Sequence, residues 1–332
     1  RHRRPAIITH DSFGRDVYDR LFSLIGGSRD EAEAFLLGNQ GPDPLFYAVL
    51  SPRLRAHNRL GSTMHDKRPN ELLAAFKSSL SVLDSVERPI GRAYALGFLC
   101  HYVLDSTAHP FVFFNEYEAC DAGEPGLTRA DGSEVHAVIE SELDELVLFK
   151  KRETTVAAFN PAEEILKASD LVLRVVSKMY VYVAVTVYGE AIPADLFATA
   201  VKDFRIAQQA FHSPRGLKRA AIGRIERLAR PHSFFRAMSH RPVKLTESVF
   251  DNHEHRTWED PFTGKARTEG FWDLYDEALR KAPPSISAFD QEGFDVEAAR
   301  RITGDLNFSG QPVVALLVSV EDSEADDIPE NA

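Results

Sequence analysis

The sequence predicts an all-α protein, and three observations lead to this prediction. Amphipathic segments with helical periodicity follow one another along most of the 332 residues. Histidines and carboxylates recur at a spacing of four residues, which places them on one face of a helix. Strand signals are sparse, and Val313–Val320 is the best candidate.

The composition is that of a globular protein with an ample core. Hydrophobic residues make up 44% of the chain, and the formal net charge is −11, from 39 basic and 50 acidic residues. This charge argues against a broad phosphate-contacting surface, so we expect no stable nucleic-acid complex. The strongest apolar run, Leu171–Tyr188, is interrupted by Arg174 and Lys178. It predicts a buried helix, and no transmembrane segment is expected.

The two ends of the chain differ in charge. Residues 1–8 are basic and lack the long apolar core of a signal peptide. We therefore expect a cytoplasmic protein, or an exported one if an upstream signal peptide has been removed, because the chain begins with Arg. Residues 321–332 are acidic and nearly devoid of core residues, which predicts a disordered tail.

The strongest signal for a metal site lies in residues 99–110. His101, Asp105 and His109 recur every fourth residue, so a helix would stack three metal-binding side chains on one face. Pro110 follows directly. Its ring clashes with a continuing helix and removes a donor, so we expect the helix to end there.

A second pair of side chains, His136 and Glu140, has the same spacing and follows a polar loop expected at 115–133. Two helices that each carry such a pair can converge on metal ions inside a bundle. Imidazole and carboxylate together suit zinc or another first-row metal better than calcium or magnesium.

Two further candidates, His10 and Asp43, precede this region. His10 lies at the start of an expected first helix, which Thr9 or Asp11 would cap. Asp43 lies between two prolines, which restrict the backbone of the loop that carries it. Such a loop fits a metal ligand and a simple Asp-Pro turn equally well.

The last candidate, His65, precedes an amphipathic helix expected at 70–86, with Asn70 as its cap. His253 and His255 are two residues apart, which suits a loop or strand better than a helix face. We expect an exposed loop there, with a place in the lining of a site as the alternative. Other helical segments are expected at 30–37, 161–188 and 191–238, including a basic stretch at 218–230, with a short helix at 271–279.

The eight candidates in chain order are His10, Asp43, His65, His101, Asp105, His109, His136 and Glu140. That order resembles the zinc-dependent phospholipase C family, whose all-α fold is shared with S1/P1-type nucleases. The closest matches are Ile8–Gly14, Gly41–Pro44, 96–112 and His136–Glu140, and the ligand-bearing part runs from about residue 7 to 144.

The resemblance implies an orthogonal multi-helix bundle with a trinuclear zinc cluster at the base of a cleft. Carried over by position, the implied ligands are His65 and His101 for one zinc ion, His136 and Glu140 for a second, His10 for a third, and Asp43 and Asp105 as bridges.

Two departures from the family's pattern affect this site. The family uses an N-terminal tryptophan as a zinc ligand, whereas nine residues precede His10 here and none is tryptophan. The family's remaining histidine follows the aspartate by six residues, where this chain has Phe111. His109, four residues after Asp105, is expected to take its place. We therefore expect two zinc ions, with the third site in question because its tryptophan ligand is missing.

The expected organisation has three parts. Residues 5–215 would form the phospholipase C-like domain, 216–320 a helical extension packed on it, and 321–332 the acidic tail. The implied activity is hydrolysis of a phosphodiester, with a phospholipid as the preferred substrate. Two metal ions would clamp phosphate oxygens and activate a water molecule, which Asp43 would orient as the catalytic carboxylate.

Three other functions stay open from the sequence. Glu140, where the nuclease branch has Asp, favours a phospholipase over a P1-like nuclease. An HD-type phosphohydrolase would use the adjacent His65 and Asp66, but it leaves the two helical pairs unexplained. A non-catalytic protein that binds zinc for folding, or binds lipid headgroups, would close its metal site with protein ligands, whereas an enzyme keeps a position open.

Overall fold

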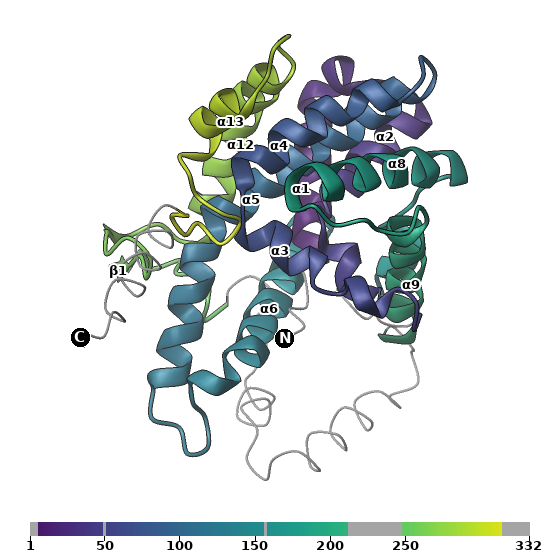
Figure 1. The fold of residues 1–332 in the computed structure, drawn as a ribbon. Coiled ribbons are helices and arrows are strands. Elements are labelled where there is room, and N and C mark those ends of the chain that lie inside the picture. Colours follow the sequence, from purple (N-terminus) through teal and green to yellow (C-terminus); the bar gives the residue numbers. More distant parts are fainter. Residues whose placement is uncertain (1–5, 49–50, 156–157, 212–247, 314–332) are drawn as a thin grey trace, which may run out of the picture.

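The computed structural model describes residues 6–48, 51–155, 158–211 and 248–313, and these are mostly helical (Figure 1). The predicted all-α fold is confirmed. The structure adds one two-stranded antiparallel hairpin, β1 (Trp258–Glu259) with β2 (Ala266–Arg267), in which Trp258 lies opposite Arg267. The candidate strand Val313–Val320, apart from its first residue, lies outside the described residues, as do the basic stretch 218–230 and the acidic tail.

Helix α5 (Glu87–Asp121) runs through the middle of the bundle, and its central residues are almost all buried (Figure 1). The helices that pack around it are α1 (Ile7–Ile25), α2 (Arg29–Gly38), α4 (Pro69–Ser78), α6 (Gly132–Arg152), α8 (Asp170–Tyr188) and α12 (Phe271–Phe289). The other helical elements are α3 (Leu60–Asp66), α7 (Pro161–Glu164), α9 (Leu196–Phe211), α13 (Val296–Thr303), and the 3₁₀ turns η1 (Asp43–Tyr47), η2 (Arg55–His57), η3 (Ser79–Val82) and η4 (Arg129–Asp131).

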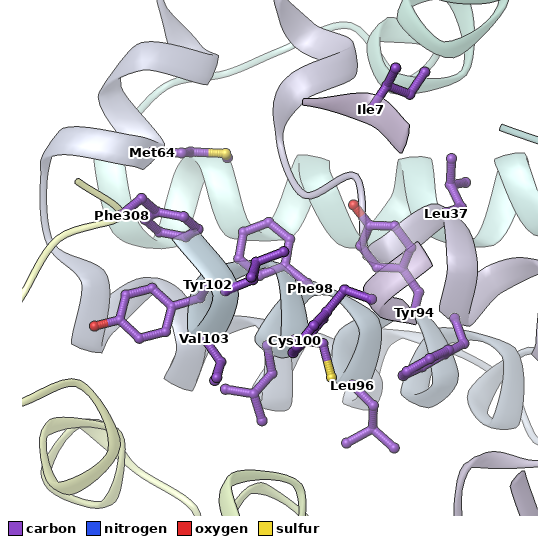
Figure 2. Close-up of a cluster of buried hydrophobic side chains, with 14 of the residues drawn as sticks. Ile7, Leu37, Met64, Tyr94, Leu96, Phe98, Cys100, Tyr102, Val103 and Phe308 are labelled. Carbon is purple, nitrogen blue, oxygen red and sulfur yellow. The ribbon is translucent and has the colours of Figure 1, made fainter. Parts of the chain in front are cut away.

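The core is rich in aromatic side chains along α5 (Figure 2). Tyr94, Phe98 and Tyr102 are 2% exposed or less, and the Phe98 ring centroid lies 4.2 Å from that of Phe76 on α4. Burying a phenylalanine side chain contributes about 2 kcal/mol to folding, so this row fixes α5 firmly in place.

Glycines let α2 and α5 cross with their backbones in contact. A Cβ on Gly38 would lie 2.3 Å from the backbone of α5, and one on Gly97 would lie 2.1 Å from the carbonyl oxygen of Phe35. No larger side chain fits at either position. The close crossing brings the carbonyl of Asn39, just after α2, to the side of α5 that carries His101.

The prediction that Pro110 ends its helix is wrong. Helix α5 continues to Asp121, although Pro110 cannot donate a hydrogen bond to the carbonyl of Ser106. Phe113 and Glu116 beyond the proline are buried and continue the inward face. Their burial outweighs the lost hydrogen bond. The loop expected at 115–133 is therefore shorter than predicted, because α5 continues to Asp121.

The helix expected at 70–86 also has different bounds. α4 runs from Pro69 to Ser78 and is followed by the separate turn η3. Pro69 takes the first helical position, where its missing N–H costs nothing. Asn70 is therefore inside the helix and is not its cap; its side-chain amide donates to Asp305 at 2.6 Å.

The described C-terminal residues, 248–313, pack on the same bundle. α12 lies along α5 and against α1, where the hydroxyl of Tyr275 donates to Asp16 at 2.8 Å. The helix predicted at 271–279 is too short, because α12 continues past Pro283 and Pro284 to Phe289. Buried apolar residues on both sides of the two prolines keep that helix face in the core.

Helix α8 covers the strongest apolar run of the sequence. By length and composition alone it is long and apolar enough to span a membrane, and more than half of that stretch is buried inside the bundle. It packs against α4, α5 and α9, with Val176, Tyr180 and Val183 fully buried. The run therefore contributes to the protein core, as the sequence predicts.

Candidate metal centre

The structure brings all eight predicted side chains together, from α1, η1, α3, α5 and α6, and all eight are buried. Their donor atoms form three groups in which every pair of atoms lies within 4.8 Å. These groups are His10, Asp43 and His101; His65, His101 and Asp105; and His109, His136 and Glu140. His101 belongs to two groups, so the first two form one continuous site.

Asp105 connects the histidines around it. Its Oδ1 lies 2.9 Å from His10 Nε2, and its Oδ2 lies 3.2 Å from His101 Nε2 and 3.8 Å from His65 Nε2. The same Oδ2 lies 3.6 Å from His109 Nδ1, which joins the third group to the others. Burial opposes ionisation, but attraction to His109, His101 and His10 outweighs it and holds the pKa of Asp105 well below its usual value. A permanent carboxylate at this place can bridge metal ions.

Asp43 is held beside the same histidines by a tight glycine turn. Its Oδ1 lies 3.1 Å from His65 Nε2 and 4.0 Å from His101 Nε2. Gly41 has a φ of +55°, and a Cβ there would lie 2.3 Å from the His101 ring. The hydroxyl of Tyr180 donates to the Gly41 carbonyl at 3.3 Å. The turn therefore requires glycine and is anchored to α8.

The third group lies between α5 and α6. Glu140 Oε1 is 3.2 Å from His109 Nε2 and 3.3 Å from His136 Nε2. Burial alone would raise the pKa of Glu140, but attraction to His136 and a hydrogen bond from His109 lower it to about 2. His109 thus occupies the place that the sequence assigns to it, although its spacing from Asp105 departs from the family's pattern.

Four of the histidines use Nδ1 for a hydrogen bond to an acceptor that has no proton of its own. The pairs are His65 with Gly61 O at 2.7 Å, His101 with Asn39 O at 2.9 Å, His109 with Phe308 O at 2.9 Å, and His136 with Glu116 Oε2 at 2.8 Å. Because each partner only accepts, each Nδ1 must carry the proton. Each Nε2 then faces the site and is the ring nitrogen that can bind a metal ion there.

His10 is oriented by the way in which α1 begins. Helix α1 starts at Ile7 after Ala6, which has no side chain to act as a cap, so the predicted caps Thr9 and Asp11 are wrong. Asp144 of α6 takes this role from a distance: its carboxylate accepts from Ile8 N at 3.1 Å and from Thr9 N at 2.8 Å.

Asp144 and His10 are both buried. Burial raises the pKa of Asp144 to about 7 against the hydrogen bonds that it accepts, and the nearby Glu140 adds to the increase. His10 Nδ1 is also buried and has no hydrogen-bond partner within the described part of the chain. A buried ring nitrogen normally has a partner, so Nδ1 is a second atom, besides Nε2, through which His10 could bind a metal ion.

Sequence reasoning missed Glu116. It lies seven residues after His109, which is two turns of a helix, so the spacing placed it on the same face. The expected end of the helix at Pro110 hid this relation. Glu116 is 8% exposed and holds His136 through the hydrogen bond described above.

We expect Glu116→Gln to weaken zinc binding by about 10- to 100-fold, because an amide holds the His136 ring less firmly than a carboxylate does. Competition with a chromophoric chelator measures this affinity. Glu118→Gln is the matched control, since Glu118 lies on the same helix but is exposed. Equal affinity of the two variants would show that Glu116 does not support a metal ligand.

A cavity of about 580 Å³ opens at the centre, and His65 and His136 form part of its wall. These two candidate ligands therefore face space that a substrate can enter, as a catalytic site requires. Buried imidazole and carboxylate donors with oriented Nε2 atoms are a donor set that fits zinc. His253 and His255 lie in a loop elsewhere and pair with Asp251 and Asp273, both at 2.7 Å.

Comparison with known protein families gave one finding. Residues 9–184, a little more than half of the chain, match the family model described as zinc dependent phospholipase C. This range includes all eight residues of the centre. Neither the curated proteins nor the solved structures gave a match. On this match, the chain belongs to the zinc-dependent phospholipase C family.

Proposed function

We propose that the protein is a zinc-dependent phosphodiesterase that cleaves the headgroup phosphate ester of a phospholipid. The observation that carries this proposal is the open cavity against a set of joined, buried His and carboxylate groups. A closed site would fit a structural role, and this site has an open side. The family of the chain supports the same reaction class.

The residues of the centre would have different roles in the proposed hydrolysis. Zinc ions held by the three groups would supply Lewis acids for the phosphate oxygens and lower the pKa of a water molecule. Asp43, placed at 3.1 Å from His65 and at the start of a rigid turn, would orient the attacking water and accept its proton. Asp105 and Glu140 keep their negative charge in the buried site.

The cavity wall favours a phospholipid headgroup over a nucleic acid. Asp66 and Glu116 add negative charge to it. Arg129 at its wall is engaged by Asp121 through two hydrogen bonds, at 2.6 and 2.9 Å, and stacks 3.9 Å from the Tyr117 ring. A polyanion therefore meets little uncompensated positive charge there.

A hydrolysis assay tests the proposal: zinc-loaded protein is incubated with mixed detergent–phospholipid micelles and, in parallel, with single-stranded DNA. We expect release of water-soluble phosphomonoester from the lipid and little cleavage of DNA. Preferential cleavage of DNA would establish the nuclease function instead. No hydrolysis of either substrate by protein that holds zinc would favour the non-catalytic function.

We expect Asp43→Asn to lower kcat by about 100-fold or more, because the amide cannot accept a proton from the attacking water. Zinc should remain at the His109, His136 and Glu140 group, which Asp43 does not enter. Asp195→Asn is the control, because the side chain of Asp195 forms an exposed ion pair with Arg53 and belongs to none of the candidate metal groups. Unchanged kcat in Asp43→Asn would remove Asp43 from the mechanism.

A further inference from the structure

A short loop near the C-terminal end of the described chain crosses α5 beside the metal centre. It spans 306–312 and lies outside the family match at 9–184. Asn307 closes it: its backbone N–H donates to Gln311 O at 2.9 Å, and its side-chain oxygen accepts from Ser309 N at 2.9 Å and Gln311 N at 3.1 Å. The loop is thus internally ordered and carries Phe308 at its centre.

Phe308 contacts both parts of the centre through its backbone. Its N–H donates to the carbonyl of His65 at 3.1 Å, and its own carbonyl accepts from His109 Nδ1 at 2.9 Å. The two histidines belong to different groups of candidate ligands. One residue of the C-terminal segment therefore connects α3 and α5 at the positions of two ligands.

The Phe308 side chain fills the space behind the same histidines. Its ring is fully buried, with centroids 5.1 Å from His65, 5.8 Å from His101 and 5.0 Å from Tyr102. Figure 2 shows Phe308 at the α5 core. The ring excludes water from the outer side of the imidazoles and limits their rotation.

The carbonyl of Phe308 decides which nitrogen of His109 faces the metal site. His109 Nδ1 also lies near Asp105, but at 3.6 Å that contact is longer than a hydrogen bond. The carbonyl at 2.9 Å is the nearer acceptor and requires the proton on Nδ1. His109 Nε2, which lies 3.2 Å from Glu140, is then the ring nitrogen that can bind a metal ion.

The loop reaches this position because Gly310 fits against the proline of α5. Gly310 has a φ of +73°, and a Cβ there would lie 2.5 Å from Pro110 Cγ and 2.8 Å from Ser106 O. Ser106 O is the carbonyl that Pro110 leaves without its helical donor. The proline directly after His109 thus creates the surface on which the loop packs.

We propose that the 306–312 loop is part of the metal centre and that Phe308 is a positioning residue for His109. The proposal rests on the metal-binding part of the proposed function and is independent of the substrate. A segment beyond the matched family region would then set the zinc affinity of the group formed by His109, His136 and Glu140.

Gly310→Ala tests this proposal against Gly304→Ala. Both glycines have a positive φ, +73° and +57°, but a Cβ on Gly304 meets nothing within 4 Å. The backbone strain is shared, and only Gly310→Ala pushes the loop away from α5. Zinc is titrated into metal-free protein against a chromophoric chelator, and cobalt absorption spectra report the ligand geometry.

We expect Gly310→Ala to bind zinc at the group of His109, His136 and Glu140 about 10- to 100-fold more weakly than wild type, and to change the cobalt spectrum. Gly304→Ala should keep the wild-type zinc affinity and the wild-type cobalt spectrum. Equal binding in the two variants would overturn the proposal. If Gly310→Ala does not fold, Phe308→Ala and Phe308→Leu take its place. Weakened binding in the first and recovery in the second would support the positioning role, and two wild-type affinities would refute it.

The outcomes for wild-type protein separate this proposal from the proposed function. If wild-type protein binds zinc but hydrolyses no phosphodiester, the hydrolase function is refuted. The zinc titrations of the Gly310 and Phe308 variants then still decide the positioning role of Phe308. Wild type that binds no zinc would refute both, because no metal centre would then exist for the loop to support.

Discussion

Asp105→Asn is expected to abolish zinc binding at the joined groups and to reduce phosphodiester hydrolysis by at least 1,000-fold, which is about 4 kcal/mol of transition-state stabilisation. The reason is the position of this carboxylate, which lies within 3.8 Å of His10, His65, His101 and His109. The amide keeps the size of the side chain but removes the negative charge that faces all four rings. Elemental analysis of purified protein and a lipid hydrolysis assay measure the two effects.

The matched control for this variant is Asp290→Asn. Asp290 also forms a charged pair, with Arg92 at 2.7 Å, but it lies just after the C-terminal end of α12 and belongs to none of the candidate metal groups. We expect it to cost some stability and to leave zinc content and hydrolysis unchanged. If Asp105→Asn keeps full zinc content and full activity, the assigned centre is wrong.

Spacing in the sequence was sufficient to predict which candidate ligands share one helix face. His101, Asp105 and His109 share a face of α5 because side chains four residues apart lie one turn above another. His136 and Glu140 share a face of α6 for the same reason. The convergence of the two helices required the family resemblance, because helical periodicity says nothing about which faces meet.

The ends of the elements were less predictable, because tertiary packing decides them. Pro110 destabilises a helix locally, but buried side chains on both sides of it keep α5 continuous. Asn70 is a good cap by itself, yet Pro69 and Asp305 fix it inside α4. Local propensity is a weak guide wherever a buried face continues across a break.

The residues that orient the ligands were beyond sequence reasoning for a different reason. Asp144 caps a helix that begins more than 130 positions earlier in the chain, and Phe308 acts on His109 through a backbone carbonyl. A backbone carbonyl is present at every position, so its role leaves no mark on residue type. Only Glu116 left a readable signal, because it lies on the same helix face as His109.

Removal of zinc is expected to lower the melting temperature by about 10 °C. Zinc at 1,000 times its dissociation constant stabilises the folded state by about 4 kcal/mol, and about 2–4 °C accompanies each kcal/mol in a domain of roughly this size. The physical reason is that the candidate ligands come from α1, η1, α3, α5 and α6, so bound ions would cross-link five elements. Without them, the negative charges on Asp105 and Glu140 stay buried beside the histidine rings.

Scanning calorimetry with and without a strong chelator measures this change, and elemental analysis establishes that the metal has left. Asp105→Asn is the internal control, because a chain that has already lost zinc from the joined groups should show a much smaller shift. An unchanged melting temperature in wild-type protein that is demonstrably free of metal would mean that the ions do not connect these elements. The folded protein would then hold its buried carboxylates without help from bound metal ions.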